Sequence, residues 1–192
     1  MPKKGNPANM FERFGVAPTY FIRFSGVWDM QDLYESMADW FKFRKYKFNE
    51  LYNEHRQPTP FGDERIYIWE AVRNENDYVQ VRYDMYFQTW DVYDFETTLA
   101  NGETRALNKG RLWLEIRCGI IYDFEKRWDD TAFHRHLKDF YNKYIMRKKT
   151  MYEYSPKFRT EAYTLHSEIK KRLKMINDQF EHEHGPGVHA RP

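Results

Sequence analysis

Residues 78–96, YVQVRYDMYFQTWDVYDFE, decide the fold class of this chain. Read at a period of two, the stretch separates into two sets of side chains. The odd positions are apolar up to Phe87 and then give Thr89, Asp91, Tyr93 and Phe95, while the even positions mix polar and aromatic residues. This alternation predicts a strand with one buried and one solvent-facing side. Such a strand would run about 60 Å, so we expect it to bend or bulge at the two polar breaks, Thr89 and Asp91.

The segments around this strand alternate between strand-like and helix-like patterns. Asp29 is a good N-cap for an amphipathic helix over residues 30–42. Ser155-Pro156 is a helix-start signal that predicts a break between two C-terminal helices, the first of them starting at Asp129 or Asp130. The remaining strands are expected at 19–25, 46–51, 65–72 and 111–122, with Gly26 ending the first.

This order of elements predicts an α+β fold. We expect a curved antiparallel sheet of about five or six strands, with one N-terminal helix and two C-terminal helices packed on one face. Residues 18–180 are expected to form a single domain. Residues 1–17 are interpreted as a flexible arm, and residues 181–192 as a polar tail that contains histidines.

Two resemblances accompany this prediction. The element order is similar to the helix-grip arrangement of START and Bet v 1-like domains, which implies a curved sheet around a long C-terminal helix and an apolar pocket. The runs DWFKFRKYKFNE (39–50), GRLWLEIRCGIIYDFE (110–125) and FYNKYIMRKK (140–149) resemble a family of small uncharacterised archaeal proteins. That resemblance covers roughly residues 20–175, and it implies no activity and no catalytic residues.

Composition narrows the classes of protein. The single cysteine, Cys118, excludes a disulfide framework within the chain. No apolar run follows the lysines near the N-terminus, so no signal peptide is expected. No window approaches the roughly 18 apolar residues of a membrane span. We therefore expect a cytoplasmic protein with no membrane partner.

The formal net charge of +2 conceals an asymmetry along the chain. Residues 29–130 contain 14 Lys and Arg against 21 Asp and Glu, a net charge of 14 − 21 = −7. Residues 131–176 contain 12 against 4, a net charge of 12 − 4 = +8. The two regions either neutralise each other within the fold, which we favour, or the basic region faces a polyanion.

The search for catalytic motifs favours a protein that is not an enzyme. The sequence lacks a glycine-rich phosphate loop, a Gly-x-Ser-x-Gly elbow, a His-Glu-x-x-His helix and a paired Cys-x-x-Cys. We predict no catalytic residue, no cofactor and no metal, although His182, His184 and His189 gather in the tail. His166 is interpreted as a surface or core histidine rather than a general base.

Three hypotheses on function remain, each with its own residues. The first is a binding module whose partner is another protein or a second copy, through the N-terminal arm and an aromatic and charged sheet face made of Arg82, Tyr86, Trp90, Trp113 and Arg117. The second is association with RNA or the ribosome through a basic helix hairpin at 143–159, made of Lys143, Arg147, Lys148, Lys149, Tyr152, Lys157 and Arg159. The third is a small-molecule binder or enzyme with an interior cavity near Thr89, Asp91 and Cys118.

For Asp91 two interpretations stay open. A carboxylate on the buried side of a strand requires a partner or a pocket. We favour a bulge that turns it outward, or pairing with an arginine or tyrosine, over a polar anchor inside a cavity.

Overall fold

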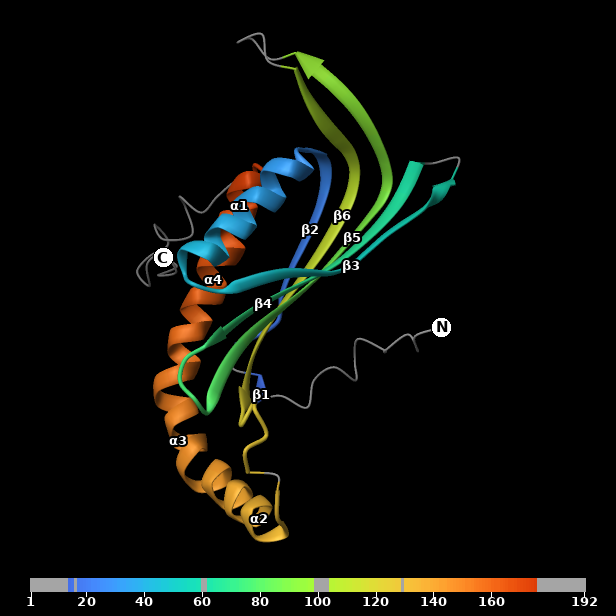
Figure 1. Cartoon of the computed structure of the whole chain (residues 1–192). Coiled ribbons are helices and arrows are strands. Elements are labelled where there is room, and N and C mark those ends of the chain that lie inside the picture. Colours follow the sequence, from blue (N-terminus) through green and yellow to red (C-terminus); the bar gives the residue numbers. More distant parts are fainter. Residues whose placement is uncertain (1–13, 16, 60–61, 99–103, 129, 176–192) are drawn as a thin grey trace, which may run out of the picture.

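A curved antiparallel sheet and two helical segments form the molecule (Figure 1). This computed structural model describes residues 14–15, 17–59, 62–98, 104–128 and 130–175. The strands are β1 (Phe14–Gly15), β2 (Tyr20–Trp28), β3 (Lys47–Thr59), β4 (Gly62–Asn74), β5 (Val79–Thr98) and β6 (Thr104–Tyr122). The helices are α1 (Met30–Phe43), α2 (Ala132–Tyr141), α3 (Arg147–Lys149) and α4 (Ser155–Arg172).

Strands β3 to β6 pair in chain order as a meander. β2, which comes earlier in the chain, pairs with β6 at the far edge. The order of the sheet is β1-β6-β5-β4-β3, with β2 pairing with the same strand as β1. All pairs are antiparallel. The α+β class and the antiparallel sheet are as predicted. Phe14 and Gly15 pair with β6, so this part of the expected arm belongs to the sheet, whereas residues 1–13 and the tail at 181–192 lie outside the described residues.

The two long helical segments lie on the same face of the sheet (Figure 1), which we call the inner face. α1 begins as predicted, since the Asp29 carboxylate accepts a hydrogen bond of 3.0 Å from the Asp32 backbone N–H. Leu33, Met37 and Phe41 recur at helical spacing and are buried against the strands. The core thus lies between the inner face and these helices, where Tyr83, Phe87 and Phe158 are fully buried.

β5 contains the predicted bulge, and the bulge reverses which residues face inward. The pairing of β5 with β6 shifts between Trp90 and Tyr93, and Asp91 adopts a positive φ of 54°. Odd positions face inward up to Thr89, whereas beyond the bulge Val92 is buried and Tyr93 and Phe95 are 53% and 39% exposed. The expectation that Tyr93 and Phe95 continue the buried side is therefore wrong, because one extra residue inverts the alternation of side chains.

Glycines on both neighbouring strands make room for this bulge. A Cβ atom at Gly110 of β6 would lie 2.8 Å from the Trp90 carbonyl oxygen and 2.9 Å from the Asp91 carbonyl oxygen. A Cβ atom at Gly62 of β4 would lie 2.6 Å from the Asp91 carbonyl carbon, and Gly62 also has a φ of 115°, which favours glycine. The sheet bends where the backbones approach each other this closely (Figure 1).

The C-terminal segment is one continuous helix over residues 132–172 and not the two helices expected from Ser155-Pro156. α2, α3 and α4 are joined by two wider π-helical turns, Asn142–Met146 and Thr150–Tyr154. Pro156 lacks a backbone N–H, and its ring would collide with the carbonyl of an ordinary preceding turn. The π-helical turn directly before it changes that geometry, so the helix continues through the proline.

The π-helical turns also keep one side of this helix against the sheet. Met146, Tyr154, Phe158 and Ala162 are buried, and together with half-buried Thr150 they recur every four residues. An α-helix of 3.6 residues per turn would rotate this row away from the sheet, and wider turns compensate for the drift. α2 lies beyond the row and has no buried residue.

Candidate functional site

The five residues predicted for an interaction face share one surface. Arg82, Tyr86 and Trp90 of β5, and Trp113 and Arg117 of β6, occupy the alternate positions that point away from α1 and α4. We call this surface the outer face. No element in the described part of the chain packs over it (Figure 1). The sequence prediction of a shared face for these residues is thus met by the strand register.

Aromatic side chains form a row across three strands of the outer face. The Trp113 ring of β6 stacks on Phe21 of β2, with ring centroids 6.3 Å apart. On its other side Trp113 meets the edge of Tyr86 of β5 at 5.9 Å. Phe21, which the sequence analysis did not assign to this face, is 53% exposed. We call Phe21, Trp113 and Tyr86 the aromatic row.

Ion pairs surround the aromatic row and neutralise most charges of the outer face. Arg82 lies between Glu70 at 2.6 Å and Asp84 at 2.7 Å. Arg117 pairs with Glu115 in the same way, along one strand. Because these side chains are mostly shielded from solvent, the pairs hold their geometry better than fully exposed ones do. The outer face therefore presents flat aromatic surface within a nearly neutral lattice of charges.

A hollow of about 390 Å³ opens next to the aromatic row. Its wall includes Trp90 and Trp113 together with Arg23 and Arg111. Arg111 is paired with Asp91, whereas Arg23 is exposed and has no ion pair within the described residues. The hollow gives the outer face a concave place for an aromatic or acidic side chain of a partner.

The cavity candidates do not come together. In the register of the sheet Thr89 lies opposite Leu112, and Cys118 lies opposite Tyr83. These two pairs are separated by six residues, about 20 Å along the strands. Asp91 is turned outward by the bulge and pairs with Arg111. The hypothesis of a polar anchor at Asp91 is therefore wrong, and the alternative of an outward, paired carboxylate is correct.

Cys118 is a buried thiol and shows no sign of activation. It is 5% exposed, and burial raises the pKa of its thiol to about 12. Tyr83 lies beside it, and burial together with Cys118 raises the pKa of the Tyr83 phenol well above its ordinary value of 10. A thiol with so high a pKa is a poor nucleophile near neutral pH.

The residues of the basic hairpin predicted at 143–159 instead lie along one continuous C-terminal helix, which curves (Figure 1). Lys149 lies 3.8 Å from Glu153, and Lys157 pairs with Glu75. The others, Lys143, Arg147, Lys148 and Arg159, are exposed and form no ion pair within the part of the chain that the structure describes, and Tyr152 is 77% exposed. Without a turn at Ser155 these cations extend over about 24 Å instead of gathering at a corner.

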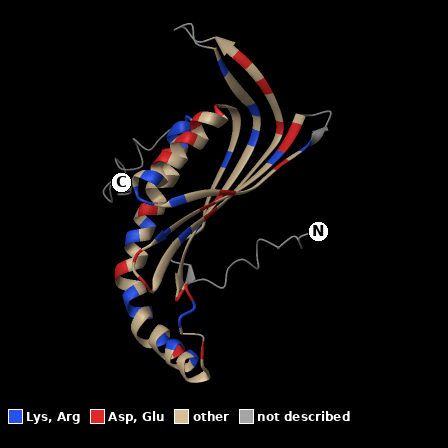
Figure 2. Cartoon of the chain, in the orientation of Figure 1, with Lys and Arg blue, Asp and Glu red and all other residues tan. Residues whose placement is uncertain are grey.

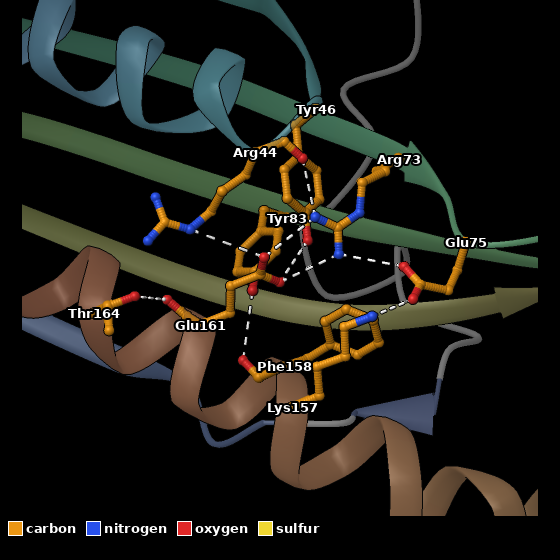
Figure 3. A network of polar contacts seen from close by, with 9 residues as sticks. All are labelled: Arg44, Tyr46, Arg73, Glu75, Tyr83, Lys157, Phe158, Glu161 and Thr164. Carbon is orange, nitrogen blue, oxygen red and sulfur yellow. Dashed lines mark hydrogen bonds and ion pairs between the residues drawn. The ribbon is translucent and has the colours of Figure 1, made fainter.

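A network of polar side chains fastens α4 to the sheet (Figure 3). Glu161 of α4 accepts a hydrogen bond of 2.8 Å from the Tyr46 hydroxyl and one of 3.2 Å from Arg73 of β4. Arg73 also lies over the Tyr46 ring at 4.2 Å and pairs with Glu75 at 3.3 Å. Burial and the neighbouring carboxylate of Glu161 raise the pKa of the Tyr46 phenol far above 10. Every charge in this cluster is paired, so we assign it to stability.

Sequence reasoning missed a second concave site, on the inner face beside the N-terminal half of α1. We call it the α1 cleft. Its volume is about 360 Å³, and its wall consists of Met30, Gln31, Tyr34, Glu50, Tyr67, Trp69, Ala106 and Asn108. These residues come from α1, β3, β4 and β6. No sequence signal joins them, because they become neighbours only when the helix packs on the strands.

Asn108 connects the α1 cleft to the start of the helix. Its side-chain oxygen accepts a hydrogen bond of 3.2 Å from the Met30 backbone N–H, and its side-chain nitrogen donates one of 2.5 Å to Asp94. The hydrogen bond from Arg65, and the one from Asn108, hold the pKa of Asp94 below its ordinary value of 3.8. Asp94 and Arg65 thus neutralise each other next to the cleft.

Comparisons with known proteins identify no family. No protein-family model matches the chain, and no curated protein is similar to it at a meaningful level. Within the described residues no group of three or more His, Cys, Asp or Glu side chains is placed to hold a metal ion. No helix of the described part is both long and apolar enough to cross a membrane.

Proposed function

We propose that this chain is a non-enzymatic interaction module that binds another protein chain through the outer face of its sheet, in the simplest case a second copy of itself. The observation that carries the proposal is the aromatic row. Trp113 of β6 contacts Phe21 of β2 on one side and Tyr86 of β5 on the other, on a face that no described element covers.

The chemistry of the outer face suits a protein partner. Aromatic side chains and arginines supply most of the binding energy at protein interfaces. Trp113 and Tyr86 are held by ring contacts and Arg82 by two carboxylates, so little side-chain freedom is left to lose on binding. A ring-to-ring contact adds about 0.5–1.5 kcal/mol beyond the area that it buries.

The distribution of charge favours a protein over a nucleic acid. A surface for phosphates requires cations that are not already neutralised. On the outer face Arg82, Arg117 and Arg111 are each paired with a carboxylate. A second copy offers the same mixture of arginines and carboxylates, so opposite charges can face each other across a two-fold contact.

The proposal is tested by measuring the mass of the purified chain at low ionic strength. Native mass spectrometry and light scattering are expected to give twice the chain mass of 23.7 kDa. Trp113→Ala should shift the equilibrium toward the monomer by at least about tenfold, as expected for a hot-spot side chain. Tyr152→Ala is the matched control, because this exposed aromatic residue lies on the C-terminal helix away from the outer face.

The outcomes separate the hypotheses. A dimer that Trp113→Ala leaves intact would refute the role of the aromatic row. A monomer that carries nucleotide mass, released by salt and lost in Lys148→Glu, would favour RNA binding through the C-terminal helix. A monomer that captures no protein in crosslinking from its native host would contradict the proposal as a whole.

A further inference from the structure

We propose that the α1 cleft binds an alkylated ammonium group, with Tyr34, Tyr67 and Trp69 as an aromatic wall and Glu50 as the counter-ion. The ligand class is an organic cation, either a free quaternary amine or a methylated lysine side chain of a peptide. The site lies on the inner face and is independent of the proposed interface on the outer face.

Three aromatic rings from two elements meet at this cleft. Trp69 of β4 lies 5.2 Å from Tyr34 of α1, at an interplanar angle of 72°. Trp69 also lies 5.8 Å from Tyr67, at an angle of 38°. Rings inclined to one another form a curved wall, and the negative electrostatic potential of their faces attracts cations.

The rings of the cleft are held in place. Phe48 of β3 packs behind them, 5.8 Å from Tyr34 and 6.0 Å from Trp69. Trp69 is only 1% exposed, whereas Tyr34 and Tyr67 are half-buried and border the opening. A wall whose residues are fixed before the ligand arrives loses little conformational entropy on binding.

Glu50 supplies a negative charge that no described side chain neutralises. Its carboxylate is exposed and forms no ion pair with a cation in the part of the chain that the structure describes. Arg65 of β4 is already paired with Asp63 at 3.2 Å and with Asp94. The cleft therefore combines aromatic surface with one uncompensated carboxylate.

The surroundings of the cleft are also acidic. Figure 2 shows Asp and Glu on α1 and toward the ends of β4 and β5, and it shows Lys and Arg both on the strands and along the C-terminal helix. Such a potential raises the local concentration of cations and disfavours anions. A volume of about 360 Å³ lies within the usual range for small-molecule sites and holds a trimethylammonium group with part of the attached molecule.

The first experiment compares a cation with its neutral isostere. Choline and 3,3-dimethylbutanol have the same shape and differ in charge. Each compound is titrated into the full-length ¹⁵N-labelled chain, to a concentration of about 100 mM. The measured signal is the indole N–H resonance of Trp69, which is assigned by its absence in Trp69→Phe. We expect choline to shift this resonance with a dissociation constant at least about tenfold lower than that of the isostere. Equal affinity for choline and 3,3-dimethylbutanol would overturn the proposal. So would the absence of any shift of the Trp69 resonance, both with choline and with a short peptide that contains trimethyllysine.

Variants test the two halves of the site. Glu50→Gln and Tyr67→Leu are each expected to weaken choline binding by about fivefold to tenfold. Glu54→Gln is the matched control, since Glu54 belongs to the same strand but pairs with Arg56 on the outer face. The proposal fails if Glu50→Gln binds as tightly as Glu54→Gln.

A peptide distinguishes the two sources of the cation. A short peptide with trimethyllysine is titrated beside its unmethylated form and beside choline. Tighter binding of the methylated peptide than of choline identifies a protein side chain as the ligand, and the reverse identifies a free quaternary amine. Preference for the unmethylated lysine would contradict recognition by the aromatic wall, because a primary ammonium loses more hydration on entering it.

Discussion

Replacing Gly110 with alanine should destabilise the protein by pressing β6 against the bulge of β5. The new methyl group would lie 2.8 Å and 2.9 Å from the Trp90 and Asp91 carbonyl oxygens. Ordinary contacts of a Cβ atom begin near 3.4 Å, so the shortfall is about 0.6 Å. Both oxygens belong to the backbone of the bulge and cannot turn away as a side chain could.

The expected cost follows from two opposing effects. Forcing an extra methyl group into close packing costs about 1–3 kcal/mol. Removing the freedom of a glycine in the unfolded chain returns about 0.5–1 kcal/mol. The two ranges combine to a net loss of about 0–2.5 kcal/mol, and because both contacts are with backbone oxygens that cannot move aside, we expect about 1–2 kcal/mol in the free energy of unfolding. For a chain of this size that corresponds to a decrease in Tm of about 3–6 °C.

The assay is urea denaturation of the wild-type chain, Gly110→Ala and Gly26→Ala, together with thermal melts. Gly26 is the matched control because it pairs directly with Gly110, yet its new Cβ atom would meet only the ring of Phe24, at 2.9 Å. That ring can rotate, so Gly26→Ala should change stability by less than about 1 kcal/mol. A loss in Gly110→Ala no greater than in Gly26→Ala would refute the idea that the bulge excludes a side chain.

Three further predictions concern buried groups. Cys118 should resist alkylation by iodoacetamide at pH 8 until the chain unfolds, because a thiol with a pKa of about 12 is almost entirely protonated at that pH. Rapid labelling of the native chain would contradict the burial of Cys118. Glu161→Ala should lower the free energy of unfolding, measured by urea denaturation, by roughly 2–3 kcal/mol, because it removes the carboxylate that Arg73 shares with Tyr46. An unchanged urea midpoint would show that the network does not contribute to stability. Burial would raise the folded-state pKa of Glu75, but the contact with Lys157 outweighs it and lowers the pKa below 4.5. The ionised Glu75 therefore stabilises the folded chain above pH 4.5, and this contribution is lost as the pH falls through the lower folded-state pKa. Glu75→Gln should therefore be less stable than the wild type at pH 7 and approach it below pH 4, and a constant difference across this range would refute the assignment.

The sequence predicted the features that depend on local pattern. The alternation from Val79 to Phe87 indicated a strand, and Asp29 marked the start of α1, as the structure confirms. The polar break at Thr89 and Asp91 indicated the bulge. These features can be predicted because the buried side of a strand and the cap of a helix are determined by residues that are close together in the sequence.

Features that depend on accumulated geometry were not predicted correctly. The alternation places Tyr93 and Phe95 on the buried side, but the extra residue of the bulge exchanges the inward and outward positions of every later residue in β5. Ser155-Pro156 predicts the start of a separate helix, but a preceding π-helical turn allows one helix to continue through the proline. The α1 cleft was missed because Tyr34, Glu50 and Tyr67 lie on three separate elements.

The position of β2 in the sheet affects how the chain folds during synthesis. Among the described strands, β2 pairs only with β6, from Tyr20 opposite Ile116 to Trp28 opposite Asn108. The partners are therefore separated by 116 − 20 = 96 to 108 − 28 = 80 residues. The strands from β3 to β6 can pair with their neighbours as they leave the ribosome, but β2 cannot pair until β6, the last strand, has been synthesised. At about 5–20 residues per second, the ribosome needs roughly 4–19 s to supply that partner. During this interval Ile22 and Trp28, both buried in the folded chain, are exposed on an unpaired strand, which makes the nascent chain a candidate for chaperone binding and for aggregation.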